Sequence, residues 1–339
     1  MDTPLKMAAL GIEHRHIFGM AGNMIAAGGE LVGWWNDGTP ETLDSFVERF
    51  PAVPRVDDYD KLLSDPEIGL ILIADIPAHR AELAIAAMEA GKDVMTDKPG
   101  CTTLAQLDEI RAVQARTGRI WSVDFSERFE VSSVTRAAEL VAAGAIGKVV
   151  HTCGLGPHRL NKPTRPDWFF DRVAYGGIIC DIASHQIDQF LYFTGSEDAE
   201  VAMASVGNYA NPETPGLQDF GELSLRSTKG HGYIRVDWYT PDALPNWGDG
   251  RLTILGTEGY IEIRKYIDIA NDTGTDHLFL VNGDSYEKID CSDSGLPFFQ
   301  RLRHDIDNRT ETAMPQRHAF KVMELAIRAQ QLAEQGGAA

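Results

Sequence analysis

The sequence predicts an α/β protein with two domains: a doubly wound parallel sheet at the N-terminus, and an α+β domain with a large, open, mostly antiparallel sheet. Three observations lead to this prediction. The chain has 339 residues, and at roughly 150 residues per domain this length suggests two domains. Up to about residue 125, short apolar runs alternate with helical segments, as they do in βαβ units. Further along, segments alternate apolar and polar side chains, as half-buried strands do.

The first domain is expected to alternate strands and helices without interruption. The run at 69–74 (GLILIA) is apolar throughout, which is typical of a strand buried on both faces. Thr39 and Pro40 suit the N-cap and the first position of a helix, and Gly91 suits a helix stop. Strands are expected at 5–10, 31–35, 69–74 and 92–96, and helices at 17–27, from 39 onward, at 78–90 and at 104–116.

The second domain is expected to begin near residue 125. Helices are predicted at 133–143 and around 178–193. Strands are predicted from the alternation of two sets of side chains: Tyr233, Arg235, Asp237 and Tyr239 on one face, and Ile234, Val236 and Trp238 on the other, with Leu223/Leu225 and Ile261/Ile263 repeating the pattern. The domains are therefore predicted as 1–125 and 126–339, and the last helix, at 319–333, can pack back on the first domain.

Composition excludes several classes of protein. Lys and Arg number 31 and Asp and Glu number 50, so the formal net charge is −19. That field repels phosphate backbones and anionic lipids, which argues against nucleic-acid and membrane partners. No apolar run reaches the roughly 18 residues of a membrane helix, and no secretory signal is recognisable. Cys101, Cys153, Cys180 and Cys291 form no close pair, which favours reduced, mostly buried thiols in a cytoplasmic protein.

The turn after the first strand is the expected place for a dinucleotide pyrophosphate. The GxGxxG fingerprint requires glycines at 11, 13 and 16, and the chain has Gly11, Glu13 and His16, with His14 between them. Only the first glycine matches, and a carboxylate at position 13 opposes phosphate binding unless it points away. From this motif alone, cofactor binding and an unliganded strand-turn-helix both remain open.

The ends of the next strands supply further candidate cofactor contacts. Asn36 or Asp37 follows the second strand, where an acceptor for the adenosine ribose is expected, although Asn, Asp and Gly also build plain turns. No arginine follows to hold a 2′-phosphate, so NAD is mildly favoured over NADP. The end of the third strand adds Ala74, Asp75 and Pro77.

Two segments are candidates for the chemistry. Asp97-Lys98-Pro99 follows the fourth strand, where such folds bind ligands, and a lysine there can donate to a substrate oxygen. In the helix around 178–193, Asp181, His185 and Asp188 are spaced i, i+4, i+7, which puts them on one face of a regular helix. Because that helix is otherwise apolar, these groups must be paired or must face a cleft.

A Pro-interrupted loop at 156–171 combines polar and aromatic side chains, including Arg159, Asn161, Arg165 and Trp168. It suits a sugar clamp or an oligomer contact equally well. The histidines His14, His16, His151, His158 and His185 fit no standard zinc spacing, so no metal is expected.

Taken in order, these motifs resemble the Gfo/Idh/MocA family of NAD(P)-dependent oxidoreductases, which act mainly on sugars and inositols. The resemblance runs from about residue 6 to residue 330. The family's Glu-Lys-Pro motif corresponds to Asp97-Lys98-Pro99, and its Gly-Gly…Asp…His motif to Gly177, Asp181 and His185. The segment 123–129 (VDFSERF) and the turn 256–259 (GTEG) also match.

The resemblance implies a Rossmann-like first domain, a second domain whose sheet mediates dimers or tetramers, and a substrate held between the domains. It implies that Lys98, Asp181 and His185 line the site beside the nicotinamide, and that Arg128 joins the cofactor contacts. We expect His185 to act as the general base, Lys98 to stabilise the developing alkoxide and Asp181 to orient the substrate or His185, although the roles of Lys98 and His185 are exchangeable. The implied reaction is hydride transfer between a secondary alcohol of a sugar, inositol or polyol and NAD(P). Two alternatives are a regulatory protein that binds cofactor or sugar without turnover, and an NAD-assisted hydrolase or lyase.

Overall fold

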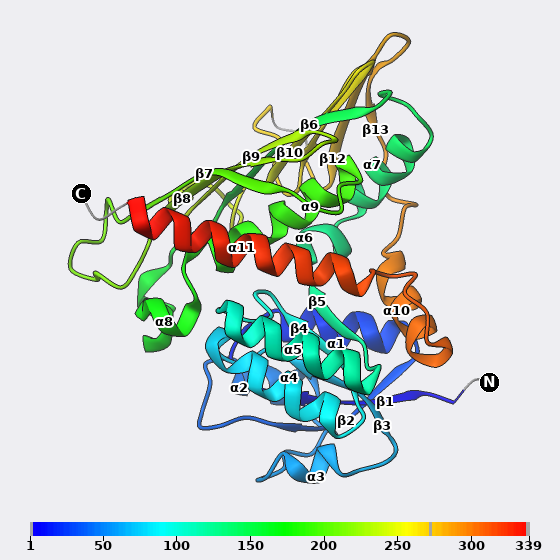
Figure 1. Cartoon of the computed structure of the whole chain (residues 1–339), viewed down its shortest axis with the longest axis vertical. Coiled ribbons are helices and arrows are strands. Elements are labelled where there is room, and N and C mark those ends of the chain that lie inside the picture. Colours follow the sequence, from blue (N-terminus) through cyan, green and yellow to red (C-terminus); the bar gives the residue numbers. More distant parts are fainter. Residues whose placement is uncertain (1–2, 271–272, 337–339) are drawn as a thin grey trace. The chain divides into compact units, whose positions relative to one another are not determined.

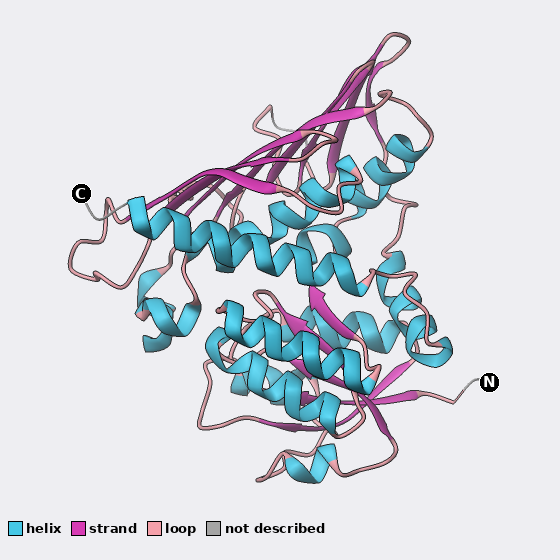
Figure 2. Cartoon of the chain, in the orientation of Figure 1, coloured by secondary structure: helices cyan, strands magenta, loops and turns pink. Residues whose placement is uncertain are grey.

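The structure is a computed structural model that describes residues 3–270 and 273–336. The chain forms two compact units. The first holds Met1–Asp124, Val173–Gly176 and Pro297–Met323, and the second holds Phe125–Arg172, Gly177–Leu296 and Glu324–Ala339. Each unit is built on one sheet with its own covering helices (Figure 1 and Figure 2).

The first unit contains a five-stranded parallel sheet in the order β2-β1-β3-β4-β5. Because the chain passes from β1 to β2 on one side and then to β3 on the other, the winding reverses between β1 and β3. Ligands of open parallel sheets bind beyond the carboxyl ends of the strands at such a reversal. The strands are β1 Leu5–Leu10, β2 Gly29–Trp35, β3 Ile68–Ile73, β4 Asp93–Asp97 and β5 Trp121–Asp124.

Helices cover both faces of this sheet. Helices α4 and α5 pack together on one face, and α1 and α10 lie together on the other (Figure 1). Trp121 of β5 stacks on Phe320 of α11, with ring centroids 5.3 Å apart. The helices are α1 Ile17–Ala26, α2 Leu43–Arg49, α3 Asp60–Leu63, α4 Arg80–Glu89, α5 Leu104–Thr117, α10 Pro297–Asn308 and the first part of α11, which spans Gln316–Gly336.

The strands and helices predicted for this domain are confirmed to within about two residues, with one exception. The helix predicted to begin at Thr39 and Pro40 begins at Leu43 instead. The segment before it is held by a tertiary contact, because the Thr42 hydroxyl donates to the carbonyl of Ile12. The prediction that residues 69–74 form a strand buried on both faces is confirmed: Leu70 to Ala74 are fully buried.

The second unit contains an eight-stranded sheet in the order β13-β12-β11-β10-β6-β9-β8-β7. The β6–β9 pair is parallel, and the other described pairs are antiparallel, which confirms the predicted mostly antiparallel sheet. The strands are β6 Val149–Pro157, β7 Glu200–Gly207, β8 Phe220–Arg226, β9 His231–Asp237, β10 Arg251–Gly256, β11 Gly259–Arg264, β12 His277–Asn282 and β13 Tyr286–Ile289.

Helices α7 (Ser132–Ala142) and α9 (Ser184–Thr194) pack on one face of this sheet. Helix α9 lies close to β6 because Gly154 has no side chain: a Cβ there would stand 2.7 Å from Cγ of Gln186. Two short α-helices are α6 (Ser126–Phe129), in the second unit, and α8 (Arg172–Tyr175), of which Val173–Tyr175 belong to the first unit.

The helix predicted around 178–193 is confirmed in extent but not in regularity. A π-helical turn, Ile179–Ala183, precedes α9. Because a π turn bonds residue i to i+5 rather than i+4, the i, i+4, i+7 spacing does not by itself place Asp181 on the face of His185 and Asp188.

The expectation of mostly buried thiols is confirmed. No disulfide joins the four cysteines within the described residues, and three of them, Cys101, Cys180 and Cys291, are buried. Among residues 3–270 and 273–336, no helix combines the length and the apolar character needed to cross a bilayer.

Candidate functional site

The turn after β1 is held against the ends of its two neighbouring strands. Gly11 has φ +74° and donates its N–H to the carbonyl of Trp35 at 2.8 Å, while His14 donates to the carbonyl of Ala74 at 2.9 Å. A Cβ at Gly11 would lie 2.4 Å from Cβ of Asp75. Only glycine has both the positive φ and the missing side chain that this turn requires. Gly11, the one glycine of the fingerprint that the sequence retains, is therefore required by the backbone of the turn.

Glu13, which stands where the fingerprint has glycine, directs its carboxylate to Asn36. Glu13 Oε1 accepts from Asn36 Nδ2 at 3.1 Å, and the same amide donates to the carbonyl of Asp37 at 2.7 Å. Asn36 Oδ1 accepts from the N–H of Ile12 at 2.7 Å. Asn36 is buried and its side chain makes three bonds that hold the turn, whereas Asp37 is exposed.

Arg55 lies at the same turn, although it comes some twenty residues later in the sequence. Its Nη2 donates to the carbonyl of Asn36 at 2.9 Å and to that of Gly38 at 3.0 Å, and its guanidinium lies over the ring of Trp34. The sequence predicts no arginine that could hold a 2′-phosphate at this turn. The structure places an exposed cation beside Asp37 from another segment.

Asp97, at the end of β4, is the centre of a buried charge cluster. Nδ1 of His16 lies 2.7 Å from Asp97 Oδ1, and Nδ1 of His14 lies 2.8 Å from Oδ2. Arg80 Nη2 lies 3.0 Å from Oδ2. Burial alone would raise the pKa of Asp97, but the Arg80 cation and the two imidazoles outweigh it and hold the pKa well below its ordinary value.

The same grouping offers the ligand atoms of a metal site, since those of His14, His16 and Asp97 lie within 4.8 Å of one another. However, Arg80 already supplies a full positive charge to the only carboxylate of the group. A divalent ion would add two positive charges beside a guanidinium. We therefore assign the cluster to ion pairing, not to a metal.

Lys98 follows Asp97 and is 95% buried at the carboxyl end of β4, with 5% of its surface exposed. The adjacent Lys98–Pro99 peptide bond is cis. Nearby, burial raises the pKa of Asp75 above its ordinary value. Pro77 is buried at the start of a short turn that leads into α4. Gly11, His14, His16, Ala74, Asp75, Pro77, Asp97 and Lys98 thus all lie at the strand ends of one sheet.

In the second unit, Asp188 forms a buried ion pair with Arg128. Its carboxylate receives both Arg128 Nε at 2.6 Å and Arg128 Nη2 at 2.7 Å, and Asp188 is fully buried. The guanidinium also lies over the rings of Phe129 and Tyr192. Arg128, which the sequence assigns to cofactor binding, is thereby engaged by α9 of its own unit.

Asp181 and His185 occupy the π turn and the first turn of α9, respectively, and both are buried. The N–H groups that open this segment are bonded by amide side chains. Gln330 Oε1 accepts from Ile179 at 3.0 Å, and Gln218 Oε1 accepts from Ile178 at 3.1 Å. These bonds fix the backbone that carries Asp181 and His185.

The arginines of the loop at 156–171 contact other residues of the same unit. Arg159 donates to the carbonyls of Pro241 and Leu244. Arg165 donates to the carbonyl of Leu160 at 2.8 Å and lies 4.4 to 5.0 Å from the rings of Phe169, Trp238 and Trp247. Asn161 donates to Thr164 at 2.8 Å, and Trp168 lies edge-on to Phe169. The loop is therefore anchored by the groups that the sequence suggested for substrate binding.

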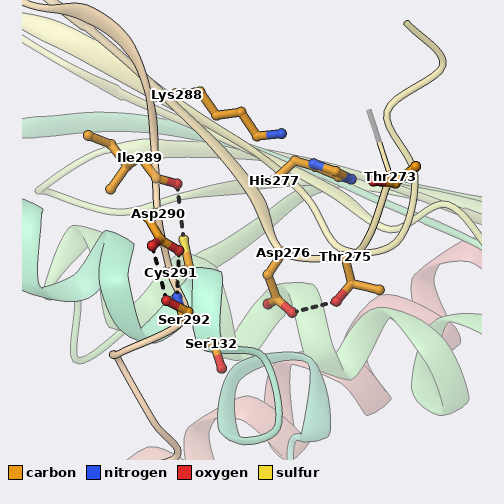
Figure 3. A pocket seen from close by; sticks show the side chains of 10 residues that line it. All are labelled: Ser132, Thr273, Thr275, Asp276, His277, Lys288, Ile289, Asp290, Cys291 and Ser292. Carbon is orange, nitrogen blue, oxygen red and sulfur yellow. Dashed lines mark hydrogen bonds between the residues drawn. The ribbon is translucent and has the colours of Figure 1, made fainter. Parts of the chain in front are cut away.

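A polar depression of about 500 Å³ lies elsewhere on the second unit, at β12, β13 and the start of α7 (Figure 3). Its acidic side chains are bonded locally: Thr275 Oγ1 donates to Asp276 and Ser292 Oγ donates to Asp290. Burial raises the pKa of the Cys291 thiol to about 11, so this sulfur stays protonated at neutral pH. The depression contains none of the site residues predicted from sequence, and we place no chemistry there.

Two residues that bear on the site, Arg80 and Arg55, are not predicted from the sequence. Arg80 falls within the helix predicted at 78–90, and no contact is predicted for Arg55. The signal for Arg80 was a charged residue within a helix that packs on a buried strand, since such a charge needs a partner. For Arg55 the sequence carried no signal, because its contact depends on a distant turn.

Comparison with known proteins supports one family for both units. Residues 13–125 match the oxidoreductase family with an NAD-binding Rossmann fold, and residues 134–262 match the GFO/IDH/MocA C-terminal domain. The crystal structure of a protein from Erwinia carotovora atroseptica SCRI1043, described as an oxidoreductase, is 46% identical, with a TM-score of 0.94. That similarity covers 97% of this chain and 98% of the other.

Two curated relatives are more distant. The uncharacterized oxidoreductase YdgJ of Escherichia coli is 34% identical over 43% of this chain and 42% of its own length. A levoglucosan dehydrogenase of Pseudarthrobacter phenanthrenivorans is 29% identical over 57% of this chain and 49% of its own. The chain spans about half the length of these curated relatives. The matched domains and the near-complete similarity to the Erwinia protein show that this chain belongs to the GFO/IDH/MocA family of oxidoreductases, with the family's NAD-binding Rossmann domain and C-terminal domain.

Proposed function

We propose that this protein is a dehydrogenase that transfers a hydride between a secondary alcohol of a sugar, inositol or related polyol and NAD or NADP. The observation that carries the proposal is the position of Lys98: a buried amine at the carboxyl end of β4, next to the reversal of winding at which parallel sheets bind ligands. The relative named as a levoglucosan dehydrogenase supports a sugar-derived substrate.

The strand ends of the first unit fit a dinucleotide. Gly11 leaves room where a Cβ would fill the turn, and Glu13 is turned toward Asn36. We assign pyrophosphate binding to the turn from Gly11 to His16, and ribose binding to Asp37. Arg55 beside Asp37 would hold a 2′-phosphate, so NAD and NADP are both compatible with this turn.

The catalytic roles are divided between a base and an electrostatic stabiliser. The nicotinamide supplies the hydride acceptor when it is bound. We assign proton removal from the hydroxyl to His185, because an imidazole exchanges protons near neutral pH. Lys98 donates a hydrogen bond to the oxygen as negative charge develops on it. Asp181 orients His185 or the substrate.

Thermal unfolding with excess NAD, NADH, NADP or NADPH tests cofactor binding. A ligand at 100 times its dissociation constant stabilises the native state by about 2.7 kcal/mol, which raises the midpoint by several degrees in a chain of this length. A rise of the unfolding midpoint with NAD and NADH, or with NADP and NADPH, identifies which of the two cofactors the protein binds. The denatured protein is also examined at 260 and 340 nm, because a tightly held nucleotide would abolish the shift; absence of both signals contradicts the proposal.

Turnover with a panel of polyols and sugars then tests the roles of the residues. Lys98→Met and His185→Asn should each lower kcat by about 10²- to 10⁴-fold while the nucleotide-induced shift remains. Turnover without net NADH formation would instead identify a hydrolase or lyase that uses NAD transiently, and binding without any turnover would identify a regulatory protein. Chelator treatment is not expected to change the rate.

A further inference from the structure

The guanidinium of Arg80 is buried among the strand ends that carry the proposed catalytic lysine. Arg80 begins α4 and is 1% exposed. Its Nε donates to the carbonyl of Asp75 at 2.7 Å, and Nη2 lies 3.0 Å from Asp97 Oδ2. Its Nη1 donates to the carbonyls of Lys98 and Pro99, the latter at 3.2 Å.

These contacts join the ends of two neighbouring strands, β3 and β4. Asp75 follows β3, and Asp97 to Pro99 end and follow β4. Through Asp97, which also contacts His14 and His16, the same cation is linked to the turn after β1. One buried side chain therefore connects the turn proposed for the pyrophosphate with the segment that carries Lys98.

The pattern of donors distinguishes this contact from an ordinary ion pair. The contact of Nη2 with Asp97 is enough to neutralise that carboxylate. Nη1 makes additional hydrogen bonds to two successive backbone carbonyls, those of Lys98 and Pro99, which an ion pair does not require. An arginine provides several donors in one rigid plane, whereas a lysine provides a single flexible point charge. We propose that Arg80 is a positioning residue: it fixes the backbone of residues 97–99 so that the Lys98 amine is held where the alkoxide develops. This inference rests on the proposed function.

The same strand provides a matched control at its other end. Arg309 donates from Nη1 and Nη2 to the two carboxylate oxygens of Asp93, at 2.7 and 2.8 Å, and Asp93 is buried at the amino end of β4. Both arginines thus bind a buried aspartate of β4 within the first unit. Arg309, however, lies at the opposite end of the strand from Lys98.

The experiment compares Arg80→Lys with Arg309→Lys in the full chain. Both substitutions keep the charge and remove the planar fork, so both should lower the melting temperature. Only Arg80→Lys should lower kcat, by about 10- to 100-fold, because small misplacements of a catalytic group cost this much. Its KM for the nucleotide should stay near the wild-type value. Arg80→Gln, which removes the charge, should lower kcat further if it folds.

A second measurement does not depend on turnover. In nucleotide-free protein, the rate at which a small acylating reagent modifies Lys98 is followed by mass spectrometry. We expect faster modification in Arg80→Lys than in wild type, and the wild-type rate in Arg309→Lys. If no substrate turns over but the labelling rates differ in this way, the proposed dehydrogenase fails and the positioning of Lys98 stands. If Arg80→Lys matches Arg309→Lys in both kcat and labelling, Arg80 is only structural and the inference is wrong.

Discussion

His14 links the stability of the protein to pH through a single side chain. Burial lowers its pKa from the ordinary 6.5 to about 4, although the Asp97 carboxylate beside it acts in the opposite direction. Between these values the unfolded chain binds a proton that the folded protein excludes. Stability is therefore full above about pH 6.5 and is lost as the pH falls toward 4. The slope is at most about 1.4 kcal/mol per pH unit, and the exposed quarter of the side chain reduces it.

The substitution His14→Gln tests this contribution, because an amide retains a donor for Asp97 but does not titrate. The free energy of unfolding, measured with denaturant between pH 4.5 and 7, should depend less steeply on pH in the variant than in wild type. Equal slopes for His14→Gln and wild type would contradict the assignment.

The role of a single residue could be predicted from the sequence only where its contacts lie within one short segment. Lys98 and His185 stood out because each follows or lies within a recognisable element. The direction of the Glu13 carboxylate could not be predicted, because it is set by a hydrogen bond from Asn36, which lies 23 residues later. Arg80, Arg55 and the Asp188–Arg128 pair are defined by tertiary contacts between separate segments, and no spacing within one segment encodes those.

Two aspartates of the π turn and of helix α9, which follows it, have different roles. Asp188 is fully buried and holds Arg128 in a two-pronged ion pair, of which the guanidinium side chain is only 10% exposed. Removing one partner leaves an uncompensated buried charge, which costs about 3–5 kcal/mol. Asp181 lies instead in the π turn, at the proposed site.

We therefore expect Asp188→Ala to lower the free energy of unfolding by about 3 kcal/mol, and Asp181→Ala to lower it less while reducing kcat more. Denaturant unfolding of the two variants measures the loss of stability, and steady-state kinetics measures the loss of kcat. Double replacement by Arg128→Met and Asp188→Leu is the control, because it removes both charges and should recover much of the stability. A stable but inactive Asp188→Ala would show instead that Asp188 belongs to the catalytic group.

The elements themselves were largely predictable. β1 and β3 read as apolar runs, and α5 has a Thr103–Gln106 capping box, so local chemistry sets their ends. The start of α2 was not predictable, because Thr42 bonds to Ile12 across the fold. The π turn before α9 was missed for a related reason: the amides of Gln218 and Gln330 accept its first N–H groups from far along the chain.

In the molecule as a whole, the outer face of the eight-stranded sheet is the surface to which we assign self-association. On the inner face, Ile254 and Ile261 are buried. On the outer face, Leu255 is 43% exposed and stands opposite Tyr260, which is 39% exposed and itself stands opposite Val281. This row crosses β10, β11 and β12 without a charge. Contiguous exposed apolar side chains of this kind mark interaction surfaces.

We propose that two copies pair through this face, because a two-fold axis brings the same patch of both copies together. Leu255→Glu then introduces two carboxylates into one interface, and the mass measured by light scattering should fall to that of one chain. Ile25→Glu replaces a similarly exposed side chain, 42% exposed on α1 of the first unit, and should leave the mass unchanged. Loss of the oligomer in both variants would point to general destabilisation, and a wild-type protein that is already monomeric at micromolar concentration would contradict the proposal. Nucleotide-induced stabilisation should survive in Leu255→Glu, because the proposed pyrophosphate and ribose contacts lie at strand ends of the first unit, far in sequence from this sheet face.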